Sequence, residues 1–274
     1  FSIVPNGGGG FFNIAGEAYM CTGSAAGLGA PAQIPHPNGP ASDTLWGWDV
    51  DIGNFKDFEG GLDVVVAAYN YDFAGAPTFA NAGEVWVFHD VLFFGFTNPI
   101  AQTQLQSQIT TNPWGQVVTG ADFGWELAVG NWDGDPFPYS ELLVGAHGGW
   151  SAGADCTGDV HLFVGGPNFG QGNANNFWFN SPTPTVSCLD RFGGGLSFID
   201  HDGDGVQDSM VCAAPWFDYG NSSQPKRGEG RVWRIDAFGI ILARLVPTVY
   251  VPYDDMTPQE LTDGHGFGSA AIQV

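Results

Sequence analysis

The chain has 274 residues, and its 29 acidic and 7 basic residues give a formal net charge of −22 at pH 7. A charge of this sign argues against nucleic acid or an anionic membrane surface as a partner. No apolar run is long enough to cross a bilayer as a helix, so membrane insertion is not expected.

The first 45 residues are expected to form the back part of a repeating unit. A second strand is expected over 1–6, a third strand over 16–21 and an irregular outer segment over 25–45. The frequent glycine and proline residues suit tight turns between short strands.

The next units each begin with an aromatic residue followed by glycine, a pair that recurs about every 70 residues. The pairs are Trp46-Gly47, Phe123-Gly124, Phe192-Gly193 and Phe267-Gly268. An acidic loop, a second apolar strand, a glycine-rich loop and a third strand follow each of the first three pairs. The third strands are expected over 83–88, 158–163 and 230–235. With an outer segment, each unit has the strand content of one β-propeller blade.

These patterns place complete units over 46–122, 123–191 and 192–266, and a first strand over 267–274. One unit is therefore split between 267–274 and 1–45. We predict a single all-β domain over 1–274, a β-propeller of four blades whose split blade closes the ring. Two alternatives remain: the chain is part of a larger propeller, or a strand from a neighbouring subunit completes the open blade.

The loop of the third unit has the most specific motif, D-x-D-x-D-G-x-x-D over 200–208. Alternate residues of a tight loop direct oxygens at one centre, which suits the six to eight oxygen ligands that Ca²⁺ prefers. A glycine after the third aspartate permits the sharp turn. We predict a structural calcium ion bound by Asp200, Asp202, Asp204, Asp208 and the backbone oxygen of Val206.

The loops of the other two units occupy the same place in the repeat, between the first and second strands, but their sequences depart from the motif. In the second unit the candidate ligands are Asn131, Asp133, Asp135 and Glu141, and the first three keep the alternate spacing. In the first unit they are Asn54, Asp57, Glu59 and Asp63. Lys56 stands there where the second acid is expected, so either a cation or a salt bridge fits the sequence. The chain is therefore expected to bind two to three calcium ions.

The four cysteines have no metal-ligand or redox spacing. Together with calcium loops they suggest an oxidising, extracellular setting, either secreted or at the cell surface. Cys156 and Cys188 flank the outer part of one unit and are the best disulfide candidates. Cys21 and Cys212 lie in apolar strands and are expected to be buried free thiols. Asn221 begins a glycosylation sequon in a polar loop.

No arrangement in the sequence predicts catalysis. Residues 149–153 match G-x-S-x-G, but a nucleophile elbow needs a helix directly after it, and a strand is expected here. The histidines have no zinc spacing. His161 alternates with Val160 and Leu162, so it is expected to be an ordinary strand residue that faces away from them. Acid pairs inside cation loops are ionised, which is a poor state for a general acid.

These motifs together make the chain resemble the FG-GAP repeat family, which forms the propeller of integrin alpha chains and of many bacterial secreted proteins. The openers, the loop 200–208, the second strands 142–147 and 211–215, and the G-x-V third strands carry the resemblance over nearly the whole chain. It implies a non-enzymatic extracellular calcium-binding propeller for adhesion, surface assembly or filament structure, acting through a protein partner or self-assembly. The alternatives are a carbohydrate-binding, lectin-like propeller and a non-catalytic domain of a larger secreted enzyme.

Overall fold

A computed structural model describes part of the chain. The described residues are 4–5, 11–12, 16–39, 44–56, 61–72, 81–91, 102–107, 120–132, 139–148, 158–171, 176–180, 191–200, 203–204, 206–207, 209–214, 231–236 and 247–250. The secondary-structure elements that they form are β-strands, so the interpretable part is all-β as the sequence predicts. Within this part there is no helix of the length and hydropathy needed to cross a membrane.

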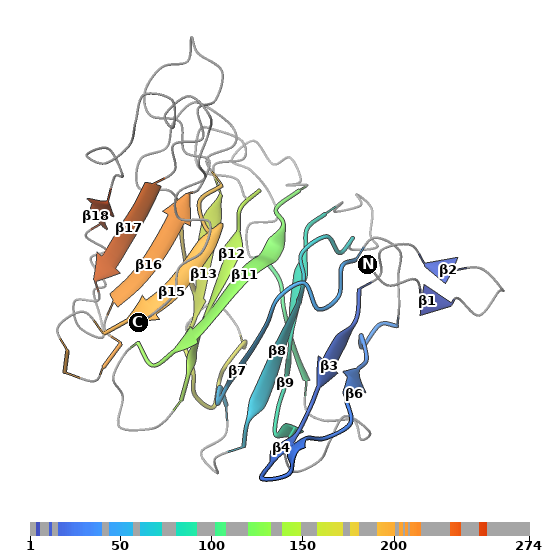
Figure 1. The fold of residues 1–274 in the computed structure, drawn as a ribbon. Coiled ribbons are helices and arrows are strands. Elements are labelled where there is room, and N and C mark those ends of the chain that lie inside the picture. Colours follow the sequence, from blue (N-terminus) through green and yellow to red (C-terminus); the bar gives the residue numbers. More distant parts are fainter. Residues whose placement is uncertain are drawn as a thin grey trace, which may run out of the picture.

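Three four-stranded antiparallel sheets make up most of the described fold (Figure 1), and in each the strands pair in chain order. The first sheet contains β7 (Val50–Gly53), β8 (Asp63–Ala68), β9 (Glu84–Phe88) and β10 (Gln102–Leu105). The second contains β11 (Phe123–Gly130), β12 (Glu141–Ala146), β13 (Asp159–Phe163) and β14 (Asn176–Asn180). The third contains β15 (Gly195–Ile199), β16 (Ser209–Ala214), β17 (Arg231–Asp236) and β18 (Pro247–Tyr250).

The N-terminal part forms three smaller antiparallel pairs. These are β1 (Val4–Pro5) with β2 (Phe11–Phe12), β3 (Ala18–Met20) with β6 (Ala32–Ile34), and β4 (Gly23–Ser24) with β5 (Gly27–Leu28). The expected second strand over 1–6 therefore contains β1, but β1 is paired with β2 and not with the third-strand segment β3. Residues 267–274, the expected closing strand, lie outside the described residues.

The sheets stack face to face because their central strands are apolar on both faces. In β8, Val65 and Ala67 pack in a cluster with residues of the second sheet, whereas Val64 and Val66 pack with Trp46 and the β3–β6 pair. A third cluster joins the second and third sheets. Burial on both faces removes the polar alternation that a one-sided strand would show, and β8, β9, β12 and β13 are buried along their whole length.

A repeated glycine contact joins each unit to the next. Gly16, Gly83 and Gly158 precede the third strands and have φ values of +75°, +75° and +83°. A Cβ on them would lie 2.2, 2.1 and 2.1 Å from the carbonyl oxygens of Trp46, Phe123 and Phe192. Only glycine tolerates both this backbone conformation and this close approach. The opener of each unit therefore packs directly on the third strand of the unit before it.

The two cysteines in the described part have different environments. Cys212 is buried in β16 as a free thiol, as predicted, and burial raises the pKa of that thiol. Cys21 is also free but exposed, so the prediction that it is buried is wrong. It follows β3, where the strand ends and the chain turns toward β4. Cys156, Cys188 and Asn221 lie outside the described residues.

Candidate cation loops and the polar contacts beside them

The described part of the third-unit loop is a tight turn held by its own aspartates. Asp200 Oδ1 accepts hydrogen bonds from the backbone N–H groups of Gly203 at 2.8 Å and Asp204 at 3.2 Å. Asp204 Oδ1 accepts one from the Val206 N–H at 2.8 Å. Gly203 has φ +79°, a backbone conformation that favours glycine. The side chains of Asp200 and Asp204 are therefore hydrogen-bond acceptors for the backbone of their own turn.

Two of the five predicted ligands in this loop, Asp202 and Asp208, lie outside the described residues. No group of three or more histidine, cysteine, aspartate or glutamate side chains in the described part is placed to hold a metal ion. Calcium binding by Asp200, Asp204 and Val206 with those two residues therefore stays a prediction.

In the first unit, the last predicted ligand is a buried strand residue. Asp63 begins β8 and is 2% exposed. Its Oδ2 accepts a hydrogen bond from the Phe55 N–H at 2.9 Å and lies 3.1 Å from His89 Nδ1. Its Oδ1 accepts one from the Asp90 N–H at 2.9 Å. The carboxylate therefore ties the loop after the first strand to the turn after the third strand.

Glu141 makes the same connection in the second unit. It begins β12, is 1% exposed, and its Oε2 accepts a hydrogen bond from the Trp132 N–H at 2.6 Å. Its Oε1 lies 3.4 Å from the N–H of Gly165, the counterpart of Asp90. In the third sheet the residue in this register position is Ser209, which pairs with Ile199 as Asp63 pairs with Gly53. Asp208, the last residue of the calcium motif, lies one position earlier, so Asp63 and Glu141 are not its structural counterparts.

The other predicted ligands of these two loops are only partly described. Asn54 and Asn131 follow β7 and β11 directly. The Asn54 N–H donates to Ser140 Oγ at 3.1 Å, and the Asn131 N–H donates to Gln207 Oε1 at 2.9 Å, so each loop is held by a neighbouring unit. Asp57, Glu59, Asp133 and Asp135 lie outside the described residues. Cation binding at these two loops also stays a prediction.

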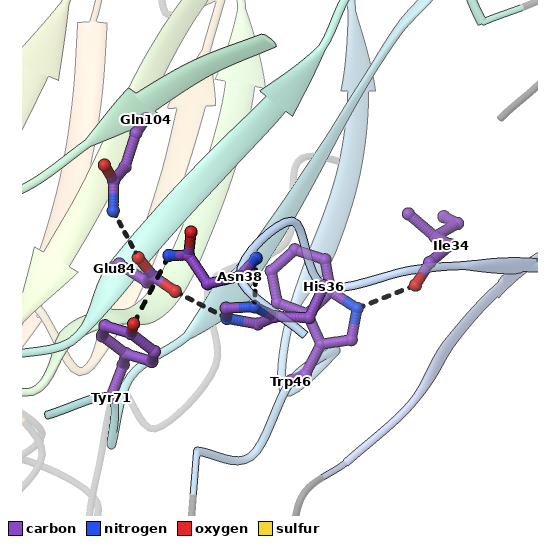
Figure 2. Close-up of polar contacts among 7 residues, drawn as sticks. All are labelled: Ile34, His36, Asn38, Trp46, Tyr71, Glu84 and Gln104. Carbon is purple, nitrogen blue, oxygen red and sulfur yellow. Dashed lines mark hydrogen bonds and ion pairs between the residues drawn. The ribbon is translucent and has the colours of Figure 1, made fainter. Parts of the chain in front are cut away.

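Buried acid–histidine contacts are a second feature, which motif analysis missed. His36 Nδ1 accepts a hydrogen bond from the Asn38 N–H at 3.1 Å, so its Nε2 carries the proton and donates to Glu84 Oε1 at 2.6 Å. Gln104 donates to Glu84 Oε2 at 2.6 Å (Figure 2). Glu84 is fully buried, and this network fastens the segment after β6 to the first sheet.

The second unit has a related pair. His161 is 2% exposed, and its Nε2 lies 3.4 Å from Oδ1 of the fully buried Asp159. Its ring packs against Phe123 and Phe163, so it faces away from Val160 and Leu162 as predicted. Its burial beside a buried carboxylate distinguishes His161 from the ordinary strand residue that the sequence predicts. The sequence signal for these sites is the acid that follows glycine at the start of a third strand, at Glu84 and Asp159.

Carboxylates also cover the open edge of β11. Asp49 Oδ2 accepts a hydrogen bond from the Leu127 N–H at 2.7 Å, and Asp51 Oδ2 accepts one from the Val129 N–H at 3.0 Å. Burial raises the pKa of both carboxyls, and these hydrogen bonds oppose the shift. Burial also raises the pKa of Glu126, on β11, to about 7, with a further contribution from the charge of Asp49.

A row of aromatic rings joins the first two units close to the aromatic–glycine pairs with which these units begin. Trp48 lies 4.8 Å from Tyr69 and 5.0 Å from Trp125 between ring centroids, and Trp125 lies 3.9 Å from His147. Trp48 is 45% exposed. Its Nε1–H donates to the Trp125 carbonyl oxygen at 2.9 Å, which holds the ring in place. Of these rings Trp48 alone is exposed, whereas Tyr69 and Trp125 are half-buried and His147 is buried.

Comparison with known proteins leaves the chain without an assigned family. No protein-family model matches the sequence, and no curated protein matches it significantly.

Proposed function

We propose that the protein is a non-enzymatic, extracellular β-propeller of the FG-GAP type, stabilised by calcium, that serves adhesion, surface assembly or filament structure through protein–protein contacts. The observation that supports it best is the repeated contact of glycine and opener between stacked four-stranded sheets. Such a scaffold leaves the loops at the two ends of the sheets available for binding. In this proposal residues 267–274 supply the first strand of the split unit, and a second strand between them and β3 completes a ring of four.

Calcium has a structural role in this proposal. It binds the loop 200–208 and stabilises the folded state in proportion to its binding free energy, because it binds the folded chain and not the unfolded one. The net charge of −22 adds to the effect, since bound cations relieve repulsion among the acids. The strong self-repulsion also favours a protein partner with a basic surface over an acidic one.

The test is thermal unfolding of the full chain in calcium and in excess chelator. We expect the melting temperature to fall by more than about 10 °C when calcium is removed. Magnesium at the same concentration is the control, because it dehydrates reluctantly and prefers a smaller octahedral site. An unchanged melting temperature in chelator would contradict the calcium role.

A second candidate function, glycan recognition, is favoured by the exposed Trp48 in its row with Tyr69 and Trp125. Indole faces stack on the apolar faces of sugars. A glycan array probed with the parent protein and with Trp48→Ala separates the two functions. Signal that the substitution abolishes would support sugar binding, whereas no signal with the parent protein leaves the protein-binding proposal.

A further inference from the structure

The three contacts between successive units differ in one respect. Around Gly124, the atoms nearest to an added Cβ include Ala67 of the second strand β8 as well as Val85 of the third strand β9. Around Gly193 they include Gly145 of β12 as well as Val160 of β13. Around Gly47, all three nearest atoms belong to Glu17 and Ala18, at the third-strand position. A second-strand residue therefore lies beside Gly124 and beside Gly193, whereas none of the three nearest atoms at Gly47 belongs to a second strand.

The pairing of β3 agrees with this difference. The third strands β9, β13 and β17 each lie between a second and a fourth strand. Among the described residues, β3 pairs only with β6, and its other edge has no strand beside it. A hollow of about 470 Å³ lies at this edge, lined by Glu17, Tyr19, Trp46 and Trp48 among others. Tyr19 is 53% exposed there, although Trp86, at the matching position of β9, is buried. A strand edge that no described strand covers, beside a hollow lined in part by aromatic rings, is a template for strand addition.

The register of the complete sheets shows which segment fits. Ala67 pairs with Val85 and Gly145 with Val160, which are the counterparts of Ala18. Val66 pairs with Trp86 and Val144 with His161, the counterparts of Tyr19. The segment 1–6, which aligns with the second strands, would place Val4 opposite Ala18 and Ile3 opposite Tyr19.

The segment 1–6 of the same chain cannot supply this strand while β1 stays paired with β2. β1 is antiparallel to β2. If β1 were also the second strand beside β3, it would be antiparallel to β3 as well, as β8 is to β9. β2 and β3 would then be parallel to each other and would lie on opposite sides of β1. Such a connection needs about a dozen residues or more. Only residues 13–15 lie between β2 and Gly16. A second copy has no such constraint, and Figure 1 shows the β1–β2 pair set apart from β3 and β6.

We propose that β1 of one copy adds to the open edge of β3 in a second copy and completes its sheet there. This inference rests on the proposed self-assembly function and specifies its contact. Because the donating and accepting surfaces differ, reciprocal exchange between two copies gives a closed dimer, and exchange from copy to copy gives rings or filaments. Since each copy carries a charge of −22, association strengthens as salt screens the repulsion.

Disulfide trapping between separate copies tests the contact. Two full-length variants, Ile3→Cys and Tyr19→Cys, are made in a Cys21→Ser background, which removes the one exposed thiol among the described residues. They are mixed in equal amounts and oxidised mildly. We expect a covalent dimer that contains one copy of each variant, and covalent dimers or larger multimers from the double variant. Leu28→Cys replaces Tyr19→Cys in the control, because Leu28 is 80% exposed on β5, away from the proposed contact, and should trap no dimer.

Two results of the trapping experiment would overturn the proposal. One is a double variant that forms the disulfide within a single chain, which would mean that the segment 1–6 completes its own sheet. The other is a mixture that traps no more dimer than the Leu28→Cys control, while thermal unfolding shows that both variants are folded. Light scattering of the unmodified chain covers the case in which a variant does not fold: a monomer at all salt and protein concentrations also overturns it. Calcium-dependent melting together with either result would leave the proposed function standing without this contact.

Discussion

The first two units and the third unit close the same loop in different ways. In the first two, the residue that begins the second strand is an acid, Asp63 or Glu141, and its carboxylate accepts hydrogen bonds from the backbone on both sides. In the third, that position holds Ser209, and the loop carries the aspartates of a calcium motif. A loop between two strands has backbone N–H groups that need partners when buried. An internal carboxylate meets this need from within the sheet, whereas in the third unit Asp200 and Asp204 of the loop itself accept the hydrogen bonds.

The largest effect is expected from removing the internal carboxylate. Asp63→Ala leaves the N–H groups of Phe55 and Asp90 and the ring of His89 without their acceptor in a buried site. We expect a loss of about 3 kcal/mol in the free energy of unfolding, measured by denaturant titration with calcium present. Asp63→Asn keeps one acceptor oxygen and serves as the graded control. A loss below about 1 kcal/mol would mean that this carboxylate does not close the loop.

The next effect separates the two kinds of loop. Asp200→Ala removes the acceptor that holds Gly203 and Asp204, and one predicted calcium ligand. We expect a cost of about 2–3 kcal/mol in calcium and about 1 kcal/mol in chelator. Asp63→Ala should cost the same in both solutions, which makes it the matched control. Equal costs for Asp200→Ala in the two solutions would contradict a cation at this loop.

A smaller effect follows from the pKa of Glu126. Its pKa is raised to about 7 in the folded protein, so the folded state binds more protons than the unfolded state between the unfolded value and about 7. Stability should therefore fall as pH rises through this window. Glu126→Gln should remove that fall and stabilise the protein at pH 8 by about 1–2 kcal/mol, after allowance for the side chain's partial exposure. Denaturant titrations at pH 5 and pH 8 measure it, and an unchanged pH dependence would exclude this group as its source.

The smallest effect concerns the turn of the acidic loop. Gly203 has φ +79°, but no atom lies within 4 Å of a Cβ added there. Gly203→Ala should therefore cost only the backbone strain, about 1 kcal/mol. Gly158→Ala has a similar φ but places its Cβ 2.1 Å from the Phe192 oxygen, so it should cost several times as much. Equal costs in denaturant titrations of the two variants would mean that the contact between units relaxes freely.

The sequence was a good guide to the strands and a weaker one to their side chains. The third strands expected over 83–88, 158–163 and 230–235 correspond to β9, β13 and β17, because glycine and alternate apolar residues mark them locally. In the sequence, Asp63 and Glu141 were aligned with Asp208 as the last ligands of their loops. Strand pairing instead gives them the register position of Ser209, one residue after Asp208 and inside the sheets. A shift of one residue changes the face on which a side chain lies, and the inserted residues of these loops hide the shift.

By itself, the sequence determined the all-β class, the repeating order of strands and the glycines between units, because each depends on local backbone preferences and on short-range patterns of apolar residues. Only the tertiary structure decided which acids are buried hydrogen-bond acceptors, why His36 is placed against Glu84 and why Cys21 is exposed. It also decided that β1 pairs with β2 and leaves an edge of β3 open among the described residues. These outcomes depend on partners distant in the chain, and a residue's type does not specify which distant segment packs against it.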